Sequence, residues 1–221
     1  MTRLVFWDVD TQCDLVHPDG KLYVPEGESV IPTLQALTDF AHAHRTPIVA
    51  SAGSHLPEDA ELSDAPDWSA TFPPHCMRGT PGEARIAQTA LTDPLVIEPE
   101  PQDPGALAHR ILGHRGDFLL MKRTLDVFGN VNAPTLLRAL EPESIAVYGV
   151  ATDLAVKHTI EGLLRHWPRA ELLLVTDAVR SFSSEEADRL LSSWGERGIH
   201  LVGAAELLSR PEVEGGIGQG V

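Results

Sequence analysis

The stretch YGVATDLAV, Tyr148 to Val156, decides the fold. An apolar run from Ser144 to Val150 ends in this stretch, and a helical pattern begins directly after it. A buried strand that turns sharply into a helix is where α/β enzymes present reactive side chains. The residue expected to react, in the first turn of the helix, is Ala155, and its methyl group cannot act as a nucleophile.

Short apolar runs alternate with helical patterns along the rest of the chain. The expected strands are Leu4–Val9, Pro47–Ala52, Leu95–Glu98, Phe118–Lys122, Ser144–Val150, Leu172–Thr176 and Ile199–Val202. The expected helices are Ser29–His44, Thr135–Leu140, Leu154–His166 and Ser184–Arg197. Runs that are apolar throughout are typical of strands covered on both faces. The sequence therefore predicts a three-layer α/β/α fold with a central, mainly parallel sheet.

The length of 221 residues fits one α/β domain, which we expect over residues 1–210. The Gly-rich residues 211–221 are expected to form a flexible tail. Two segments lack periodicity, the long loop Gly53–Ile86 and the Pro-rich connection Pro99–Gly105. Loops as long as the first are usually functional or disordered.

Composition excludes several classes of partner. The net charge of −15 repels phosphate backbones and anionic membranes, so we expect no nucleic-acid or membrane partner. No apolar run approaches the roughly 20 residues of a membrane helix, and the chain enters its first expected strand without a targeting pattern. Two cysteines give neither a disulfide framework nor a Cys-rich zinc pattern. A soluble, cytoplasmic protein is expected.

Candidate site positions lie at the ends of three of the expected strands. Asp10 lies at the carboxyl edge of the first, Lys122 closes the fourth, and Ala155 follows the fifth. Ligands of parallel sheets bind at this edge, so we expect the three positions to converge. Taken alone, an Asp at a strand end is more often a turn cap, and a terminal lysine is more often a surface residue.

Four blocks of sequence resemble the isochorismatase-like cysteine hydrolase superfamily and, within it, the nicotinamidase-type amidohydrolases. They are Asp10–Asp14 (DTQCD), Phe72–Gly82 (FPPHCMRGTPG), Lys122–Phe128 (KRTLDVF) and Gly149–Val156 (GVATDLAV). The likeness runs from about Phe6 to Asp177. Each block alone is a weak signal, whereas four in the same order are specific.

The resemblance implies a role for each strand-end position. Asp10 would be the general base, Lys122 would orient it, and residue 155 would be the nucleophile. A thiolate at 155 would attack an amide carbonyl and form a thioester that water hydrolyses after ammonia leaves. Backbone N–H groups of Ala151 and Ala155 would form the oxyanion hole, with a cis Val150–Ala151 peptide. Ala155 closes the covalent route.

The metal site of nicotinamidase-like relatives is also altered. Their Asp-x-His pair corresponds to Gly53-Ser54-His55, so only His55 and His75 remain as ligands. Glu58 or Asp59 is a candidate for the missing oxygen, and the plainer interpretation is that the histidines are loop residues. The resemblance requires no cofactor, and weak binding of a divalent ion such as zinc stays open.

Further residues are candidates for the pocket lining or for a substitute nucleophile. Gln12, Trp68, Phe72 and Phe128 are predicted to line the pocket, although core packing is the commoner fate of aromatic residues. Cys13 and Cys76 are not expected at a helix N-terminus opposite the oxyanion donors, and most free cysteines are small buried hydrophobes.

The sequence leaves two main hypotheses. The first is a hydrolase of non-peptide C–N bonds in a small, nicotinamide-like amide, inactive here because residue 155 is alanine. The second is a pseudoenzyme that binds a small molecule or assists assembly. A third hypothesis uses water activated by Asp10. The resemblance also implies a homo-oligomer. Two explanations compete for the alanine at position 155: a deliberate Cys→Ala replacement and natural divergence.

Overall fold

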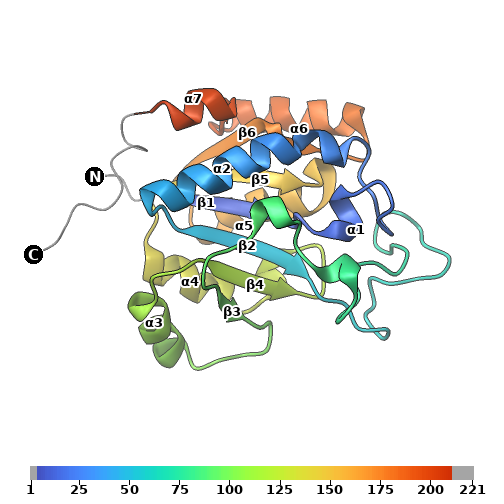
Figure 1. Ribbon diagram of the computed structural model, residues 1–221, viewed down its shortest axis with the longest axis horizontal. Helices are drawn as coiled ribbons and strands as arrows, with labels where there is room; N and C mark the ends of the chain where they lie inside the picture. Colours follow the sequence, from blue (N-terminus) through green and yellow to red (C-terminus); the bar gives the residue numbers. More distant parts are fainter. Residues whose placement is uncertain (1–3, 211–221) are drawn as a thin grey trace, which may run out of the picture.

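The computed structural model describes residues 4–210, which form a seven-stranded sheet between two layers of helices (Figure 1). The sheet order is β3-β4-β2-β1-β5-β6-β7, and all pairings are parallel. The strands are β1 (Leu4–Val9), β2 (Ile48–Gly53), β3 (Leu95–Ile97), β4 (Phe118–Lys122), β5 (Ser144–Val150), β6 (Glu171–Arg180) and β7 (His200–Val202). The predicted three-layer architecture is confirmed, and the sheet is parallel throughout rather than mainly parallel. The predicted tail, residues 211–221, lies outside the described residues.

Seven α-helices are present in residues 4–210, with short 3-10 turns between them. The helices are α1 (Cys13–Val16), α2 (Ile31–His44), α3 (Pro104–Gly113), α4 (Ala133–Leu140), α5 (Lys157–His166), α6 (Ser184–Glu196) and α7 (Ala204–Leu208). The 3-10 turns are Gly27–Val30, Pro81–Glu83, Ala87–Thr89 and Val127–Gly129. Over the same residues, none of these helices has the length and apolar character needed to cross a membrane.

Two hydrophobic cores lie on opposite faces of the sheet. In β1, Trp7 belongs to the core that α3, α4, α5 and α6 cover, whereas Phe6 belongs to the core that α1, α2 and α7 cover. Successive side chains of a strand point to opposite faces, so strands buried on both sides must be apolar at nearly every position. All seven residues of β5 are buried, as this requires.

Several elements differ from the prediction, including the short helices α1 and α7, which the sequence did not predict. Helix α3 was not expected, although Asp103 caps it by accepting a hydrogen bond from Ala106 N at 2.7 Å and Pro104 stands at its first position. Strand β6 continues to Arg180, four residues beyond its predicted end. The helix predicted from Leu154 begins as a π-helical stretch, Thr152–Val156, before α5 starts at Lys157.

The strands that carry the candidate residues end at one edge of the sheet. Val9 is paired with Ser51 of β2 and Gly149 of β5, and Gly53 is paired with Lys122. Gly149 has φ +117°, and a Cβ there would lie 2.1 Å from the Val9 oxygen, so only glycine fits. This close approach brings the end of β1 against the turn that follows β5. The loop of residues 54–86 leaves from the same edge, on the right in Figure 1.

Candidate active site

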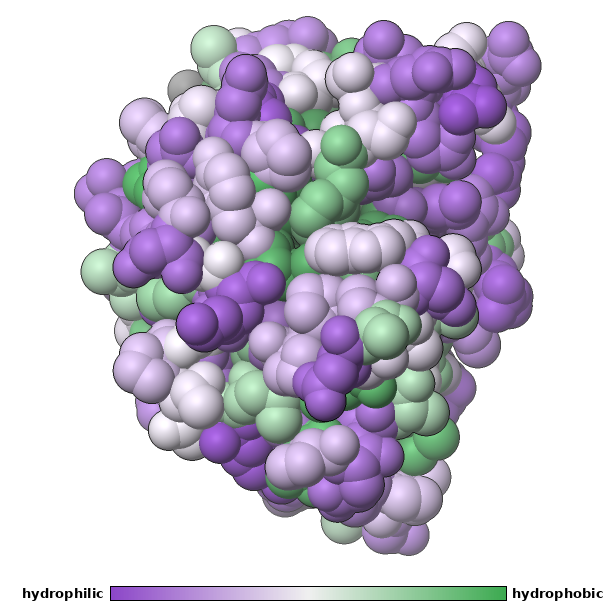
Figure 2. Space-filling model, turned by 90° about the vertical axis from the view of Figure 1, so that its right-hand side faces the viewer, coloured by the Kyte–Doolittle hydropathy of each residue, from purple (hydrophilic) through white to green (hydrophobic). Residues whose placement is uncertain are grey.

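A cavity opens at the carboxyl edge of the sheet. Its polar lining comprises Asp10, Gln12, His55, Glu61, His75 and Lys122, and its apolar lining includes Leu15, Leu22, Val24, Leu125, Ala151, Leu154, Ala155 and Phe182. Figure 2 shows this end of the molecule, with a hollow near the centre where hydrophobic residues are exposed among polar ones. The three positions expected to converge, Asp10, Lys122 and Ala155, line the same cavity.

Asp10 and Lys122 form a buried ion pair. Lys122 Nζ lies 2.8 Å from Asp10 Oδ2, and each side chain is 5% exposed. Nζ also donates to the backbone oxygens of Thr124 at 2.9 Å and Leu125 at 3.3 Å, so its three N–H bonds are all used. Ser51, which sequence reasoning missed, donates its hydroxyl to Asp10 Oδ1 at 2.6 Å. The pair is therefore fixed in place, and each charge compensates the other.

The turn after β5 supplies backbone rather than reactive side chains. The Val150–Ala151 peptide is cis, as the resemblance implies. Ala151 and Ala155 are each 4% exposed and line the cavity. The oxyanion role predicted for their backbone N–H groups stays a prediction. The Ala155 side chain offers the cavity a methyl group at the position where a nucleophile is expected.

Neither cysteine has the features of an activated thiol. Cys76 is buried and lines the cavity, and burial raises the pKa of its thiol. Cys13 begins the four-residue helix α1, a placement that the sequence did not predict. Burial, followed by the nearby carboxylates Asp14 and Asp19, raises the pKa of the Cys13 thiol. Both thiols are therefore protonated at neutral pH and are poor nucleophiles.

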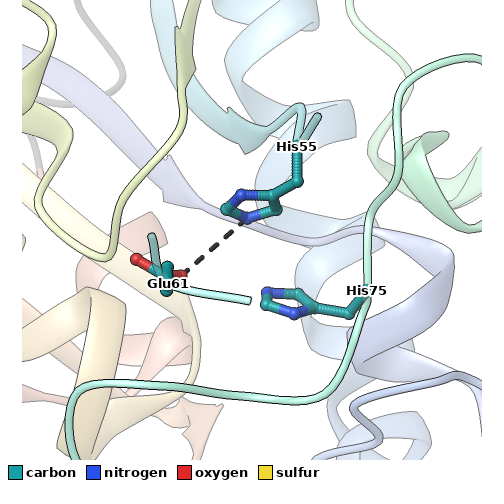
Figure 3. Close-up of side chains that lie close together, drawn as sticks. All are labelled: His55, Glu61 and His75. Carbon is teal, nitrogen blue, oxygen red and sulfur yellow. Dashed lines mark ion pairs between the residues drawn. The ribbon is translucent and has the colours of Figure 1, made fainter. Parts of the chain in front are cut away.

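His55, Glu61 and His75 form a cluster (Figure 3). The cluster lines the same cavity as the ion pair. One ligand atom from each residue lies within 4.8 Å of the others, and all three residues are buried. His55 Nε2 is 3.8 Å from Glu61 Oε1, and the two imidazole rings are 4.7 Å apart between centroids. Two imidazole nitrogens and one carboxylate oxygen form a donor set that catalytic zinc sites use.

Glu61 is the acidic residue of this cluster, in place of the predicted Glu58 or Asp59. The Glu58 side chain is 71% exposed, and Asp59 pairs through Oδ1 with Arg123. Backbone bonds from Asp59 N to Leu56 O and from Leu62 N to Asp59 O turn the chain here, at 3.0 Å each. A Cβ on Gly53 would lie 3.1 Å from His55 Nε2, so this position faces the cluster but contributes no ligand.

Burial sets the protonation of the cluster. It lowers the pKa of His55 to about 4, with further lowering by His75 and Lys122, and it also lowers the pKa of His75. It raises the pKa of Glu61, against the opposing charge of Lys122. Both imidazoles are therefore neutral at pH 7, which is the form that binds metal ions.

Gln12 lines the cavity, but its amide is occupied by the backbone. Oε1 accepts from Gly53 N at 2.8 Å, and Nε2 donates to Gly53 O at 2.8 Å and to Glu83 O at 2.7 Å. Asp14, two residues later, accepts from Cys76 N at 2.7 Å. These two side chains of the DTQCD block thus hold the loop that carries His55, Glu61 and His75.

The three aromatic residues predicted to line the pocket lie outside its lining. Phe128 stacks on Trp7 and His166, in the core on the other side of the sheet. Phe72 is 1% exposed and packs behind His75, and Trp68 contacts Phe72 from the surface with 60% of its area exposed. Core packing therefore accounts for Phe72 and Phe128, and aliphatic residues with Phe182 form the apolar wall instead.

Comparison with known proteins agrees with this arrangement. The chain matches the Isochorismatase domain over residues 3–206. It is 26% identical over 199 residues to the nicotinamidase/pyrazinamidase of Mycobacterium tuberculosis, covering 88% of this chain and 95% of the relative. The crystal structure of the pyrazinamidase of Pyrococcus horikoshii in complex with zinc superposes with a TM-score of 0.72 at 24% identity, over 91% and 99% of the two chains. The crystal structure of the N-carbamoylsarcosine amidase of Thermoplasma acidophilum superposes with a TM-score of 0.68 at 20% identity, over 92% of this chain and 97% of that chain. Since the domain match spans nearly the whole chain and its neighbours share the fold, this protein belongs to the isochorismatase-like hydrolase superfamily.

Proposed function

We propose that this chain binds a small, nicotinamide-like amide in the cavity and that Ala155 closes the covalent route to its hydrolysis. One observation carries the proposal: the Asp10–Lys122 pair and the methyl of Ala155 line a single cavity. The curated relative named nicotinamidase/pyrazinamidase supports the choice of amide. The apolar wall with Phe182 suits the ring of such a ligand.

The chemistry that is lost can be stated step by step. With a thiol at 155, Asp10 would accept its proton, and the thiolate would attack the amide carbonyl. Ammonia would leave with a proton from Asp10, and water would cleave the thioester to give the acid. Ala155 has no atom that can form the first bond. Substrate contacts to backbone N–H groups of the turn need no side chain, so binding remains open.

A divalent cation such as zinc fits the His55–Glu61–His75 cluster. The donors are two neutral imidazoles and a buried carboxylate, and three protein ligands leave a coordination position for a ligand in the cavity. A bound ion would supply a Lewis acid that polarises a carbonyl oxygen. The side chains of His55, Glu61 and His75 would hold it, while Asp10 and Lys122 stay paired beside it.

Calorimetry and an ammonia assay on matched variants test the proposal. The unaltered chain is expected to bind nicotinamide and release no ammonia. Ala155→Cys is expected to release ammonia at a rate on the order of 10³-fold or more above the background without enzyme, because it restores the nucleophile. Asp10→Asn in the Ala155→Cys background is the control and is expected to abolish the gain. A chain that binds neither nicotinamide nor pyrazinamide, with or without zinc, contradicts the proposal.

The pseudoenzyme alternative is favoured by the second missing group, since Gly53 offers no carboxylate to the cluster. It predicts that Ala155→Cys binds the amide as the unaltered chain does and still cleaves nothing. Ammonia release by the unaltered chain that disappears in Asp10→Asn would instead support water activation by Asp10.

A further inference from the structure

A line of charged side chains extends from the end of β4 to the side of His55 remote from Glu61. Arg123 Nε donates to Asp59 Oδ1 at 2.7 Å, and a terminal nitrogen of Arg123 donates to the same oxygen. Asp59 Oδ2 accepts from Leu56 N at 2.9 Å and lies 3.4 Å from His55 Nδ1, a buried atom that has no aligned hydrogen-bond partner among residues 4–210. The side chains of Asp59 and His55 are 5% and 2% exposed. The carboxylate is thus held from two directions and faces one imidazole nitrogen.

We propose that Asp59 and Arg123 are positioning residues that keep the proton of His55 on Nδ1 and direct the Nε2 lone pair into the cavity. The Asp59 carboxylate lies nearer to Nδ1, at 3.4 Å, than the Glu61 carboxylate lies to Nε2, at 3.8 Å, although Nδ1 makes no aligned hydrogen bond. An ionised carboxylate repels the lone pair of an unprotonated nitrogen, so Asp59 favours the proton on Nδ1. In a neutral imidazole the other nitrogen is then an acceptor. His55 Nε2 lies 3.8 Å from Glu61 Oε1, on the cavity side.

His75 provides an independent parallel. Its Nδ1 lies 2.9 Å from the Pro73 carbonyl oxygen, which can only accept a hydrogen bond. The tautomer of His75 is therefore fixed by backbone, and its Nε2 is the nitrogen left for the cluster. Histidines that bind metals generally have such a partner on the other ring nitrogen. In His55 the carboxylate of Asp59 lies on the corresponding side of the ring, at 3.4 Å and without an aligned hydrogen bond.

The burial of Asp59 distinguishes this arrangement from a surface ion pair. Arg123 also approaches Glu58, at 3.9 Å, but the Glu58 side chain is 71% exposed and such a pair contributes little. Asp59 is enclosed beside His55, where its charge requires compensation. The end of β4 therefore supplies two neighbouring cations, Lys122 for Asp10 and Arg123 for Asp59.

The tautomer can be measured directly in the metal-free, full-length protein. Long-range ¹H–¹⁵N spectra of histidine labelled at both ring nitrogens are expected to show His55 with its proton on Nδ1. Asp59→Ala and Arg123→Ala are expected to increase the Nε2–H form, and Arg123→Lys to restore most of the Nδ1–H form. Arg197→Ala is the matched control, because it removes a bidentate pair with Glu161 remote from the cavity.

Two results would overturn the proposal. One is a His55 that carries its proton on Nε2 in the unaltered chain, and the other is an unchanged His55 tautomer in Asp59→Ala. If Asp59→Ala fails to fold, Arg123→Ala alone decides.

Cobalt(II) affinity gives a second readout, which rests on the proposed cation site. Arg123→Ala is expected to bind Co²⁺ about 10–100-fold more weakly than the unaltered chain or Arg197→Ala, as is typical when such partners are removed. If the unaltered chain binds no Co²⁺ but the His55 tautomer changes in Asp59→Ala, the cation site is refuted and the positioning role is supported. Equal Co²⁺ affinity in all variants, with an unchanged tautomer, refutes the positioning role alone.

Discussion

The cavity has two walls that are held in different ways. The strand-end wall, with Asp10, Lys122 and the Val150–Ala155 turn, extends from strands that are paired along their length. The loop wall, with His55, Glu61 and His75, lies on residues 54–86, where only isolated bridges such as His55–Met77 pair the backbone. Side chains of the first wall and its neighbours, Gln12 and Arg123 among them, bind the second. Backbone pairing thus fixes one wall, and individual side chains fix the other.

The strongest test of the strand-end wall is Lys122→Ala. It leaves the buried Asp10 carboxylate without a counter-ion and is expected to lower the free energy of unfolding by about 3–5 kcal/mol. Urea denaturation measures this change. Lys157→Ala is the control, since Lys157 is 40% exposed and its nitrogen is 3.7 Å from Glu186. Equal effects of the two substitutions would show that the wall does not depend on the buried pair.

Gly149→Ala tests the close approach of β1 and β5. The added Cβ would meet the Val9 oxygen and hold a positive φ, so we expect a loss on the order of 3 kcal/mol in the free energy of unfolding. Gly198→Ala separates the two causes, because Gly198 has φ +87° with no atom within 4 Å of the added Cβ. Its expected cost is about 1 kcal/mol. A Gly149→Ala variant no less stable than Gly198→Ala would mean that β1 and β5 can move apart.

Gln12→Leu tests the loop wall. It removes the partners of Gly53 N and O and of Glu83 O, at an expected cost of about 1–3 kcal/mol. Hydrogen exchange is expected to accelerate between Gly53 and Glu83 and to stay slow in β1 and β5. Gln102→Leu is the control, because within residues 4–210 the Gln102 side-chain amide is hydrogen-bonded only to the exposed Arg110. Equal acceleration in the strands would show that the two walls are one cooperative unit.

The smallest expected effect is at the tip of the loop. Asp67 Oδ1 accepts from the backbone N–H of Ser69, Ala70 and Thr71, and these bonds hold the pKa of Asp67 below its usual value. Because the pKa of Asp67 is lowered in the folded protein, its carboxylate stabilises the tip at any pH above the unfolded-state pKa of 3.8. This stabilisation is lost as the pH falls through the folded-state pKa. At pH 7, Asp67→Ala should therefore accelerate exchange of those three amides several-fold. The midpoint of global unfolding should stay unchanged, and a clear shift would contradict this local role.

The two walls also differ in how far the sequence predicts them. Asp10, Lys122 and Ala155 were placed together because parallel strands end at a common edge, and apolar runs reveal those ends. Glu61 has no such signal, since it lies in a loop without periodicity and becomes a cluster member only through the turn at Leu56–Leu62. Helix α3 had a signal in Asp103 and Pro104 that the surrounding prolines concealed. Phe128 was misplaced because chain position does not determine which core an aromatic ring enters.

The Gln12 amide joins both ends of the loop, at Gly53 and Glu83. Nearer the tip, Phe72 N donates to Glu61 O at 2.8 Å and Ser63 N donates to Phe72 O at 2.9 Å, so residues 64–71 project beyond a second closure. New chain termini, inserted peptides or fluorescent labels placed between 64 and 71 would leave the cavity residues where they are. That segment is thus a natural attachment point for a reporter of ligand binding.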